Sequence, residues 1–413
     1  GRAAGRAGPG AAAVEQRMAP PRVLVLVLAG GAGGRLELLT EHRAKPAVPF
    51  GGVYRLIDFP LSNCQHSGIA DVWVSVQQHP ASLALHLANG RPWDLDRSSG
   101  GMLTLPPHQG GDREGWHSGT ADSLWRNTAL VREHDPAALV VVSADAVYRL
   151  DYRDVVEEHL GSGAEVTMVT TEVPPEDASR YGVVQLGDDG RVAEYAYKPE
   201  DPVGSTVATE VFVLTPGAVL DRLDALADEV GEEGLQDLGN RLLPDLARDG
   251  VARSRPMPGY WRDVGTVEAY WQAHQDFLAE DPPLHLDDPA WPVHTREGAD
   301  AAARVLRSAE VGDSLLSGGT RVAGAVHGSV LSPNVVVEAG ATVVDSVLLP
   351  GAVVRAGAVV RRAVVDDRVV VGERATVGGD GPLTLAGRAV EVPAGAVVEA
   401  GARYPDPDDD AAG

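Results

Sequence analysis

The 413-residue chain has a single cysteine, Cys64, which excludes an internal disulfide framework and any zinc site built from several cysteines. It also lacks long hydrophobic runs: the longest, at 23–29, has the length of a strand and falls short of the roughly 18 residues of a membrane span. Residues 1–20 contain no hydrophobic segment of a secretory signal, and we expect them to form a disordered extension. These absences predict a soluble, cytoplasmic protein.

Lysine is scarce, whereas negative charge is abundant. The net charge of −24 would repel nucleic acid and anionic membranes, so we expect neither as a partner. Only Lys45 and Lys198 are lysines, although 35 residues are Lys or Arg. Because lysine is a flexible point charge and arginine a planar fork, these two positions are candidates for phosphate contacts. The alternative, that two structural lysines remain by chance, stays open on composition alone.

Residues 21–280 alternate short β-branched runs with amphipathic stretches, which predicts an α/β domain with a mostly parallel sheet covered by helices. Pro60 and Gly68 bracket a predicted helix, and Thr120 precedes another with Asp122 in its first turn. The clearest predicted strands are 23–29, 71–76, 138–143 and 165–171.

A proline-rich, acidic connector is expected at 281–304, followed by a second domain at 305–403 and an acidic, disordered tail at 404–413. The second domain is almost free of aromatic residues and repeats valine every six residues, which predicts a prism of stacked coils with a narrow valine core. An ordinary antiparallel sheet is the alternative. The six repeating positions are Val347, Val353, Val359, Val365, Val371 and Val377.

The predicted first strand ends in a glycine-rich loop, Gly30-Gly31-Ala32-Gly33-Gly34-Arg35. Glycine lets backbone N–H groups approach phosphate oxygens, and Arg35 adds positive charge. The spacing fits neither a Walker loop nor the dinucleotide fingerprint. Taken alone, the loop is as compatible with a plain tight turn as with a phosphate site.

The segment from Leu39 to Gly52, which contains Lys45-Pro46, follows directly, and together with the loop it resembles the signature of sugar nucleotidyltransferases. Further motifs at 54–59, 61–64, 119–122 and 260–266 resemble the glucose-1-phosphate adenylyltransferase family over roughly residues 22–378. The resemblance implies a Rossmann-like nucleotidyltransferase domain followed by a left-handed parallel β-helix of hexapeptide repeats.

The activity implied by this resemblance joins ATP and glucose 1-phosphate into ADP-glucose and pyrophosphate, for glycogen or other α-glucan synthesis, with Mg²⁺ as the metal. The resemblance also assigns metal binding to two aspartates. One is Asp145, which follows the predicted strand 138–143, and the other is Asp237. Each aspartate considered alone could instead be a helix cap or a turn residue. A homotetramer regulated by an anionic metabolite is also implied, with Arg361 and Arg362 as possible anion contacts or, equally, solvated corner residues of the coil.

The remaining site residues are also assigned by resemblance. Arg35, Lys45 and Asp145 are the expected catalytic residues. The nucleotide is expected to contact Gly30, Gly31, Arg35, Lys45, Gln109, Gly119, Thr120, Ala121 and Asp122. The sugar phosphate is expected to contact His117, Gly182, Tyr197, Lys198, Ala208 and Glu210.

Several positions depart from the family pattern, mostly on the sugar side. Tyr197 stands where the family has a glutamate, and Ala208-Thr209-Glu210 stands in place of Ser-Met-Gly. These changes leave two alternatives: a nucleotidyltransferase for a different sugar 1-phosphate, or a catalytically weak regulatory subunit. An acyltransferase activity in the coil is a third, disfavoured because His327 is the only histidine of that domain. Further departures are His117-Ser118, Ala144, Ala146 and Arg241.

Overall fold

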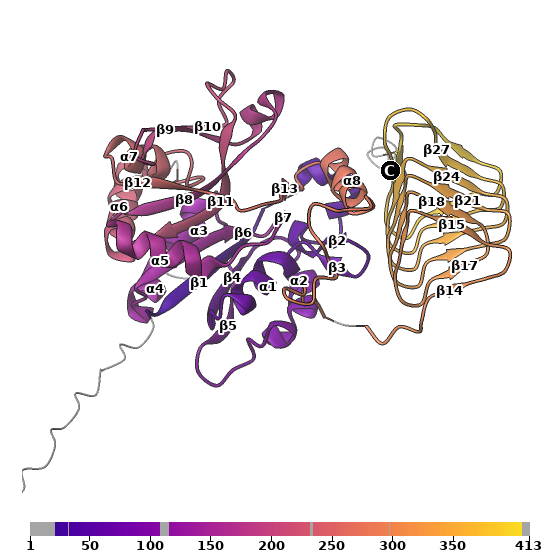
Figure 1. The fold of residues 1–413 in the computed structure, drawn as a ribbon, viewed down its shortest axis with the longest axis horizontal. Coiled ribbons are helices and arrows are strands. Elements are labelled where there is room, and N and C mark those ends of the chain that lie inside the picture. Colours follow the sequence, from indigo (N-terminus) through magenta and orange to yellow (C-terminus); the bar gives the residue numbers. More distant parts are fainter. Residues whose placement is uncertain (1–20, 32, 108–114, 232–233, 297, 407–413) are drawn as a thin grey trace, which may run out of the picture.

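The computed structural model describes residues 21–31, 33–107, 115–231, 234–296 and 298–406. The extension predicted at 1–20, most of the tail predicted at 404–413, and Gln109 lie outside these residues. An α/β domain and a coil of short strands lie side by side, with the chain passing from one to the other once (Figure 1). Among the described residues, no helix combines the length and apolarity required to cross a bilayer.

The central sheet confirms three predicted strands to the residue: β1 (Val23–Ala29), β4 (Asp71–Val76) and β6 (Ala138–Ser143). The fourth, β8 (Val166–Glu172), begins one residue later than predicted. The other strands of the central sheet are β5 (Gly101–Leu105), β9 (Gly182–Leu186), β10 (Val192–Tyr197), β11 (Thr206–Leu214) and β12 (Ala252–Pro256).

This nine-stranded sheet has the order β10-β9-β11-β6-β1-β4-β5, with β8 placed between β11 and β12. β1 pairs in parallel with β4 and β6, whereas β11 runs antiparallel to β6. Consecutive residues of β1 enter different cores, Leu24 on one face and Val25 on the other, which is why the strand is apolar throughout. The sheet is therefore mixed, and its parallel half brings the carboxyl ends of β1 and β6 together.

Helices cover the two faces of this sheet (Figure 1). The helix predicted from Pro60 begins earlier, at Asp58, and Gly68 follows its end with φ of 65°. The helix predicted after Thr120 is two helices, α3 and α4, separated at Asn127. The bounds are α1 (Asp58–His66), α2 (Pro80–Leu87), α3 (Thr120–Arg126), α4 (Thr128–His134), α5 (Tyr152–Ser162), α6 (Pro216–Val230), α7 (Leu242–Arg248) and α8 (Val267–Asp276). Two small antiparallel pairs complete the domain: β2 (Pro49–Phe50) with β3 (Tyr54–Arg55), and β7 (Ala146–Tyr148) with β13 (Trp261–Asp263).

The second domain is a β-helix of three six-stranded parallel sheets. The first consists of β14 (Arg304–Val305), β17 (Arg321–Val322), β20 (Val336–Val337), β23 (Val353–Val354), β26 (Val370–Val371) and β29 (Glu391–Val392). The second consists of β15 (Glu310–Gly312), β18 (Ala325–His327), β21 (Thr342–Val344), β24 (Val359–Arg361), β27 (Thr376–Gly378) and β30 (Val397–Val398). The third consists of β16 (Leu315–Leu316), β19 (Val330–Leu331), β22 (Val347–Leu348), β25 (Ala363–Val365), β28 (Thr384–Ala386) and β31 (Arg403–Tyr404).

The unbroken six-residue core predicted for this domain is wrong in detail. The register Val337↔Val354↔Val371 advances 17 residues per coil, so one of the three sides is a residue shorter than six. Val353 and Val359 are consequently only half-buried, and the next residue of each strand enters the core instead. The core-facing residues of successive strands are Leu331, Val337, Val343, Leu348, Val354, Val360, Val365, Val371 and Val377.

The outer face of the third sheet is buried against the α/β domain. Val347, predicted as a core valine, points the other way and packs with Val330 and Val364 in a cluster that also contains Leu36 and Phe50. Burying a side chain of this size contributes about 1.5–3 kcal/mol. The two domains therefore share an apolar interface rather than meeting only at the connector.

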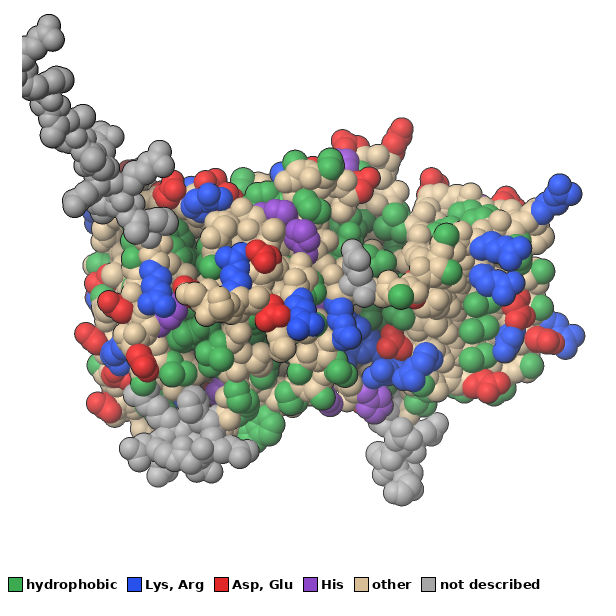
Figure 2. Space-filling view, turned by 90° about the horizontal axis from the view of Figure 1, so that it is seen from below, with side chains coloured by type: hydrophobic (Ala, Val, Ile, Leu, Met, Phe, Trp, Pro, Cys, Tyr) green, Lys and Arg blue, Asp and Glu red, His purple; other side chains and the backbone are tan. Residues whose placement is uncertain are grey.

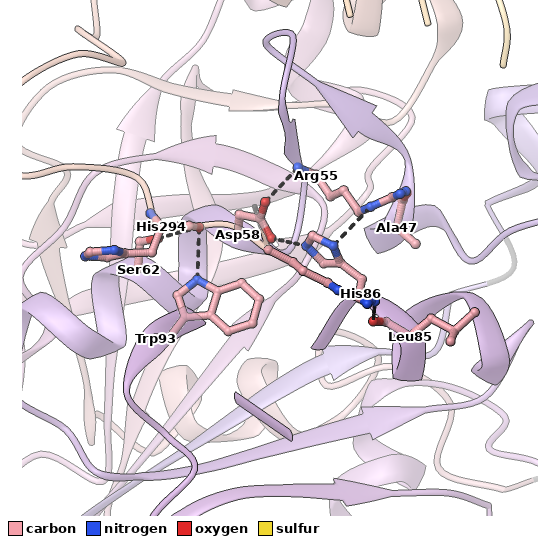
Figure 3. Close-up of polar contacts among 9 residues, drawn as sticks. Ala47, Arg55, Asp58, Ser62, Leu85, His86, Trp93 and His294 are labelled. Atoms are coloured by element: carbon pink, nitrogen blue, oxygen red, sulfur yellow. Dashed lines mark hydrogen bonds and ion pairs between the residues drawn. The ribbon is translucent and has the colours of Figure 1, made fainter. Parts of the chain in front are cut away.

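The segment predicted as the connector is anchored along the α/β domain. The Trp93 indole donates a hydrogen bond to the His294 carbonyl (3.1 Å), and the His294 N–H donates one to the Ser62 hydroxyl (2.8 Å; Figure 3). Beside them, the Asp58 carboxylate bonds the His86 ring (2.5 Å), while its other oxygen accepts from the Arg55 N–H (2.8 Å; Figure 3). The contacts of His294 with Trp93 and Ser62 hold the connector against the α/β domain before the chain enters the β-helix.

Candidate active site

A cavity of about 420 Å³ opens where β1 and β6 end, the edge at which open α/β sheets bind their ligands. Most of the residues that the sequence proposed for the site line it, from both the nucleotide and the sugar groups. They are Gly30, Gly31, Arg35, Lys45, His117, Gly119, Thr120, Asp145, Tyr197, Lys198, Glu210 and Asp237. Segments that are far apart in the chain thus converge on one space.

Four of the proposed residues do not line this cavity. Asp122 lies behind it, where its carboxylate accepts from the Ser118 N–H (2.8 Å), and Ala121 is buried in the core beside it. Gly182 leaves room for a neighbouring ring: a Cβ there would lie 2.1 Å from the Tyr195 hydroxyl. Ala208 is buried in the core. These four positions support the walls of the cavity.

Lys45 and Asp145 form the central ion pair. Lys45 opens the short 3-10 helix Lys45–Ala47, and its ammonium donates to an Asp145 carboxylate oxygen at 2.6 Å. The second oxygen of Asp145 accepts a hydrogen bond from the Ser143 hydroxyl at the end of β6. Burial opposes ionisation of Asp145, but the Lys45 charge outweighs it and holds the carboxyl pKa below its usual value. Both groups are therefore charged at neutral pH.

Asp263 is a carboxylate to which the sequence analysis gave no role, although it lies in the motif at 260–266. Because β13 pairs with β7 and sets Asp263 opposite Ala146, its carboxylate comes close to Asp145. Burial raises the pKa of Asp263, the Lys45 charge opposes the rise, and the neighbouring Asp145 adds to it. A smaller cavity of about 30 Å³ is lined by both carboxylates and by Arg35.

Asp237 lies on the other side of the main cavity. One of its oxygens accepts from the Thr120 N–H (3.0 Å) and the other from the Tyr197 hydroxyl (2.7 Å). The same hydroxyl accepts a hydrogen bond from the Lys198 ammonium (2.8 Å). Asp237 therefore orients the tyrosine that holds Lys198, and its expected role as a metal ligand stays a prediction.

Glu210 has an unusual backbone. It has φ of 59°, a left-handed conformation that glycine adopts far more readily, and it lies where the pairing of β11 with β8 breaks between Ala208 and Phe212. Its side chain lines both cavities. Burial, with the negative charges of Asp145 and Asp263, raises the pKa of Glu210 to about 7.

Several lining residues were missed by the sequence analysis. Gln77, which follows β4, clamps the backbone of His117: its amide donates to the His117 carbonyl (3.1 Å) and accepts from the His117 N–H (2.7 Å). A polar residue directly after a buried strand was the available signal. The other missed residues are Leu28, Pro46, Ser118, Ser123, Val141, Ser143, Tyr195, Phe212, Leu238, Gly239 and Leu243.

The wall that carries Lys45 is supported from behind by the β-helix. Arg43, two residues before Lys45, is buried, and its guanidinium donates to the Asp366 carboxylate at 2.6 Å. Asp367 lies 3.6 Å from the same guanidinium. This buried pair joins the nucleotide side of the cavity to the second domain.

The two arginines proposed as anion contacts lie in the β-helix, away from the cavity lining. Arg361 is 3.6 Å from Asp380, and the Arg362 guanidinium stacks over the Trp271 ring at 4.4 Å. Basic side chains also gather near the junction of the domains on the face shown in Figure 2. An anion-binding role for Arg361 and Arg362 stays a prediction.

Comparison with known proteins agrees with this architecture. A family model described as nucleotidyl transferase matches residues 24–280, and one described as GlmU-like, C-terminal hexapeptide matches residues 300–398. The glucose-1-phosphate adenylyltransferase of Fusobacterium nucleatum is 36% identical over 330 residues, covering 79% of this chain and 85% of the relative. That of Clostridium botulinum is 38% identical over 331 residues, covering 80% and 85%. That of Acetivibrio thermocellus is 36% identical over 332 residues, covering 80% and 78%.

Proposed function

The chain belongs to the glucose-1-phosphate adenylyltransferase family, and we propose that its cavity transfers the adenylyl group of ATP to glucose 1-phosphate, giving ADP-glucose and pyrophosphate. The observation that carries the proposal is the placement of the two lysines of the chain in one cavity. Lys45 lies beside the glycine loop and Asp145, and Lys198 lies beside Tyr197 and Asp237. Two separate cations suit two phosphorylated substrates that must meet.

The chemistry requires little more than positioning and charge. Arg35 and Lys45 would hold the nucleotide phosphates beside the glycine loop, and Lys198 would hold the sugar phosphate. An oxygen of the sugar phosphate then attacks the α-phosphorus as the bond to pyrophosphate breaks, without a covalent enzyme intermediate. The fixed charges of Arg35 and Lys45 stabilise the negative charge that develops on the departing pyrophosphate.

A divalent cation, Mg²⁺ by preference, fits the carboxylates on the nucleotide side. Asp145 and Asp263 offer hard oxygen ligands, and the raised pKa of Asp263 reflects burial and the crowding of negative charge that a cation would relieve. Within the described ranges, no group of three or more His, Cys, Asp or Glu residues is arranged to hold a metal, so further ligands would come from the nucleotide and water. Bound there, Mg²⁺ would neutralise phosphate charge.

The substrate assignment is tested by pyrophosphate release from purified protein with Mg²⁺. ATP should be compared with UTP, dTTP and GTP, and glucose 1-phosphate with its galactose and mannose counterparts. The proposal expects the highest kcat/KM among these natural pairs for ATP and glucose 1-phosphate, and a loss of at least about 10²-fold in Asp145→Asn. Turnover with another pair only, or none with any pair, would overturn it.

The metal assignment has its own test, which does not depend on turnover. Mg²⁺ binding in the presence of ATP can be measured by calorimetry in Asp145→Asn and Asp263→Asn, with Asp237→Asn as the matched control. We expect the first two variants to weaken Mg²⁺ binding roughly tenfold or more, because each removes a charged ligand. A larger effect from Asp237→Asn would restore the original assignment of Asp237 as a ligand.

We also propose, from the family resemblance, a cytoplasmic homotetramer whose activity responds to an anionic metabolite. The apolar interface between the domains and the basic side chains near their junction are compatible with an effector pocket there. Sedimentation velocity tests the tetramer: a single species of monomer mass across micromolar concentrations would contradict it.

A further inference from the structure

Three non-glycine residues on or beside the sugar side of the cavity have left-handed backbone. Lys198 (φ 47°), Glu210 (φ 59°) and Gln236 (φ 55°) all have left-handed conformations, and none is glycine. A left-handed conformation at each such residue costs about 1 kcal/mol of folding free energy. Strain of this kind persists where the surrounding structure holds the residue in place, and it clusters at functional sites. Lys198 and Glu210 both line the cavity, so the strained backbone directs a cation and an acid into the same space.

The Glu210 carboxylate differs in its contacts from the other acids of the cavity. Among the residues that the structure describes, it makes no hydrogen bond and no ion pair within 4 Å. The neighbouring acids differ: Asp145 is paired with Lys45, and Asp237 accepts from Thr120 and Tyr197. A half-buried carboxylate without a donor is unfavourable unless something that enters the cavity satisfies it.

Binding of the two phosphorylated substrates would leave Glu210 more isolated still. The positive charges of Lys198 and Lys45 favour the ionised form of Glu210, and the proposed function gives each of these lysines to a phosphate. The walls beside it, Tyr195 and Phe212, are aromatic. A group of the substrate can supply the missing donor, and a cationic group would gain the most because a charge-assisted hydrogen bond is about twice as strong as a neutral one.

We propose that Glu210 is a specificity-determining residue that favours hexose 1-phosphates bearing a free amino group over glucose 1-phosphate. The inference rests on the proposed function, since it assumes that Lys198 holds the sugar phosphate. It concerns the preferred sugar, and glucose 1-phosphate remains a substrate. The ammonium of such a sugar would favour ionisation of Glu210 and pair with the resulting carboxylate.

The experiment uses glucose 1-phosphates in which the hydroxyl at carbon 2, 3, 4 or 6 is replaced by an amino group. For each, kcat/KM with ATP and Mg²⁺ is divided by the value for glucose 1-phosphate. The wild-type protein should favour at least one amino sugar by roughly tenfold. Glu210→Gln should bring that ratio to about one, whereas Glu194→Gln, an exposed glutamate of β10, should leave it unchanged.

The inference is overturned if the wild-type protein favours no amino sugar, or if the preference survives in Glu210→Gln. If no sugar phosphate yields pyrophosphate, the proposed function fails, and the same ratios measured as Kd values by calorimetry decide the inference. N-acetylation of the favoured amino sugar removes its charge and should abolish the preference. Retained preference for the acetylated sugar would show that size rather than charge is selected, against the proposal.

Discussion

The two sides of the cavity are built differently. On the nucleotide side, Lys45 stands on a short regular helix, is fixed by Asp145 at the end of β6, and is supported from behind through Arg43 and the β-helix. On the sugar side, Lys198 and Glu210 stand on left-handed backbone. A regular element thus holds the nucleotide-side lysine, whereas left-handed backbone holds the lysine and the acid of the sugar side.

This difference is consistent with the departure from the family pattern at Glu210. Residues fixed by strand pairing and by a second domain can change little without moving the reacting groups. Side chains on irregular backbone can change identity while the sheet behind them stays intact. Glu210, which departs from the family pattern, belongs to the second group, whereas Tyr197, which also departs from it, is the last residue of β10 and pairs with Gly182.

The largest expected effect comes from removing the nucleotide-side cation. Lys45→Met should lower kcat/KM for ATP by about 10³-fold, because Lys45 both contacts phosphate and keeps Asp145 paired. Steady-state kinetics measures the loss, and thermal unfolding checks that the variant is folded. A folded variant with less than a tenfold loss would contradict the role given to Lys45.

A slightly smaller effect, on the free energy of unfolding, is expected from breaking the Arg43–Asp366 pair, through which the β-helix supports the nucleotide side. Asp366→Asn leaves the Arg43 guanidinium buried beside only the more distant Asp367, which should lower the free energy of unfolding by about 3 kcal/mol. Asp367→Asn is the matched control, and we expect less than about 1 kcal/mol from it. Urea denaturation measures both. Equal effects would indicate that the buried pair does not support this wall.

The sugar-side lysine should behave differently from Lys45. Lys198→Met should raise KM for glucose 1-phosphate by about 10²-fold, because one charge-assisted contact to phosphate is lost. The KM for ATP should change less than about threefold. Equal increases in the KM values for glucose 1-phosphate and ATP would contradict the assignment of Lys198 to the sugar side alone.

A pH-dependent loss of stability is the smallest expected effect. The pKa of Glu210, raised from 4.5 to about 7 by burial and by Asp145 and Asp263 against the opposing charges of Lys198 and Lys45, keeps this carboxyl protonated in the folded protein. Its unfolded counterpart ionises near pH 4.5, so rising pH favours the unfolded state in this window. Between pH 4.5 and 7 the wild-type protein should lose about 2 kcal/mol of stability relative to Glu210→Gln.

Urea denaturation at several pH values checks this expectation. Asp145 and Asp263 titrate in both proteins, so the difference between the two curves isolates Glu210. A difference that is independent of pH would mean that the Glu210 carboxyl is ionised throughout the window. In that case the ionised carboxylate would not destabilise the folded protein, and the inference that Glu210 needs a partner from the substrate would be contradicted.

The sequence predicted regular structure best where burial dictates composition. β1, β4 and β6 are buried on both faces, so their apolar runs mark their bounds. The core spacing of the β-helix was predicted to be too regular, because the shorter side of the central coils is visible only in the stacking of Val337, Val354 and Val371. Local pattern does not encode that register.

The site was predictable where resemblance and chemistry pointed to the same residues, as for Lys45 and Asp145. Asp263 was given no role because its proximity to Asp145 depends on the pairing of β13 with β7, two segments far apart in the chain. The conformation of Glu210 depends on a break in strand pairing that no local propensity predicts. Long-range pairing thus determined what the sequence analysis missed.

The most direct test of the central claim is to incubate the purified protein with Mg²⁺ and ATP, with and without glucose 1-phosphate, and to measure ADP-glucose and pyrophosphate together. The account predicts equal amounts of the two products when glucose 1-phosphate is present and neither product when it is absent. Pyrophosphate release without the sugar phosphate, or no ADP-glucose in its presence, would contradict the account.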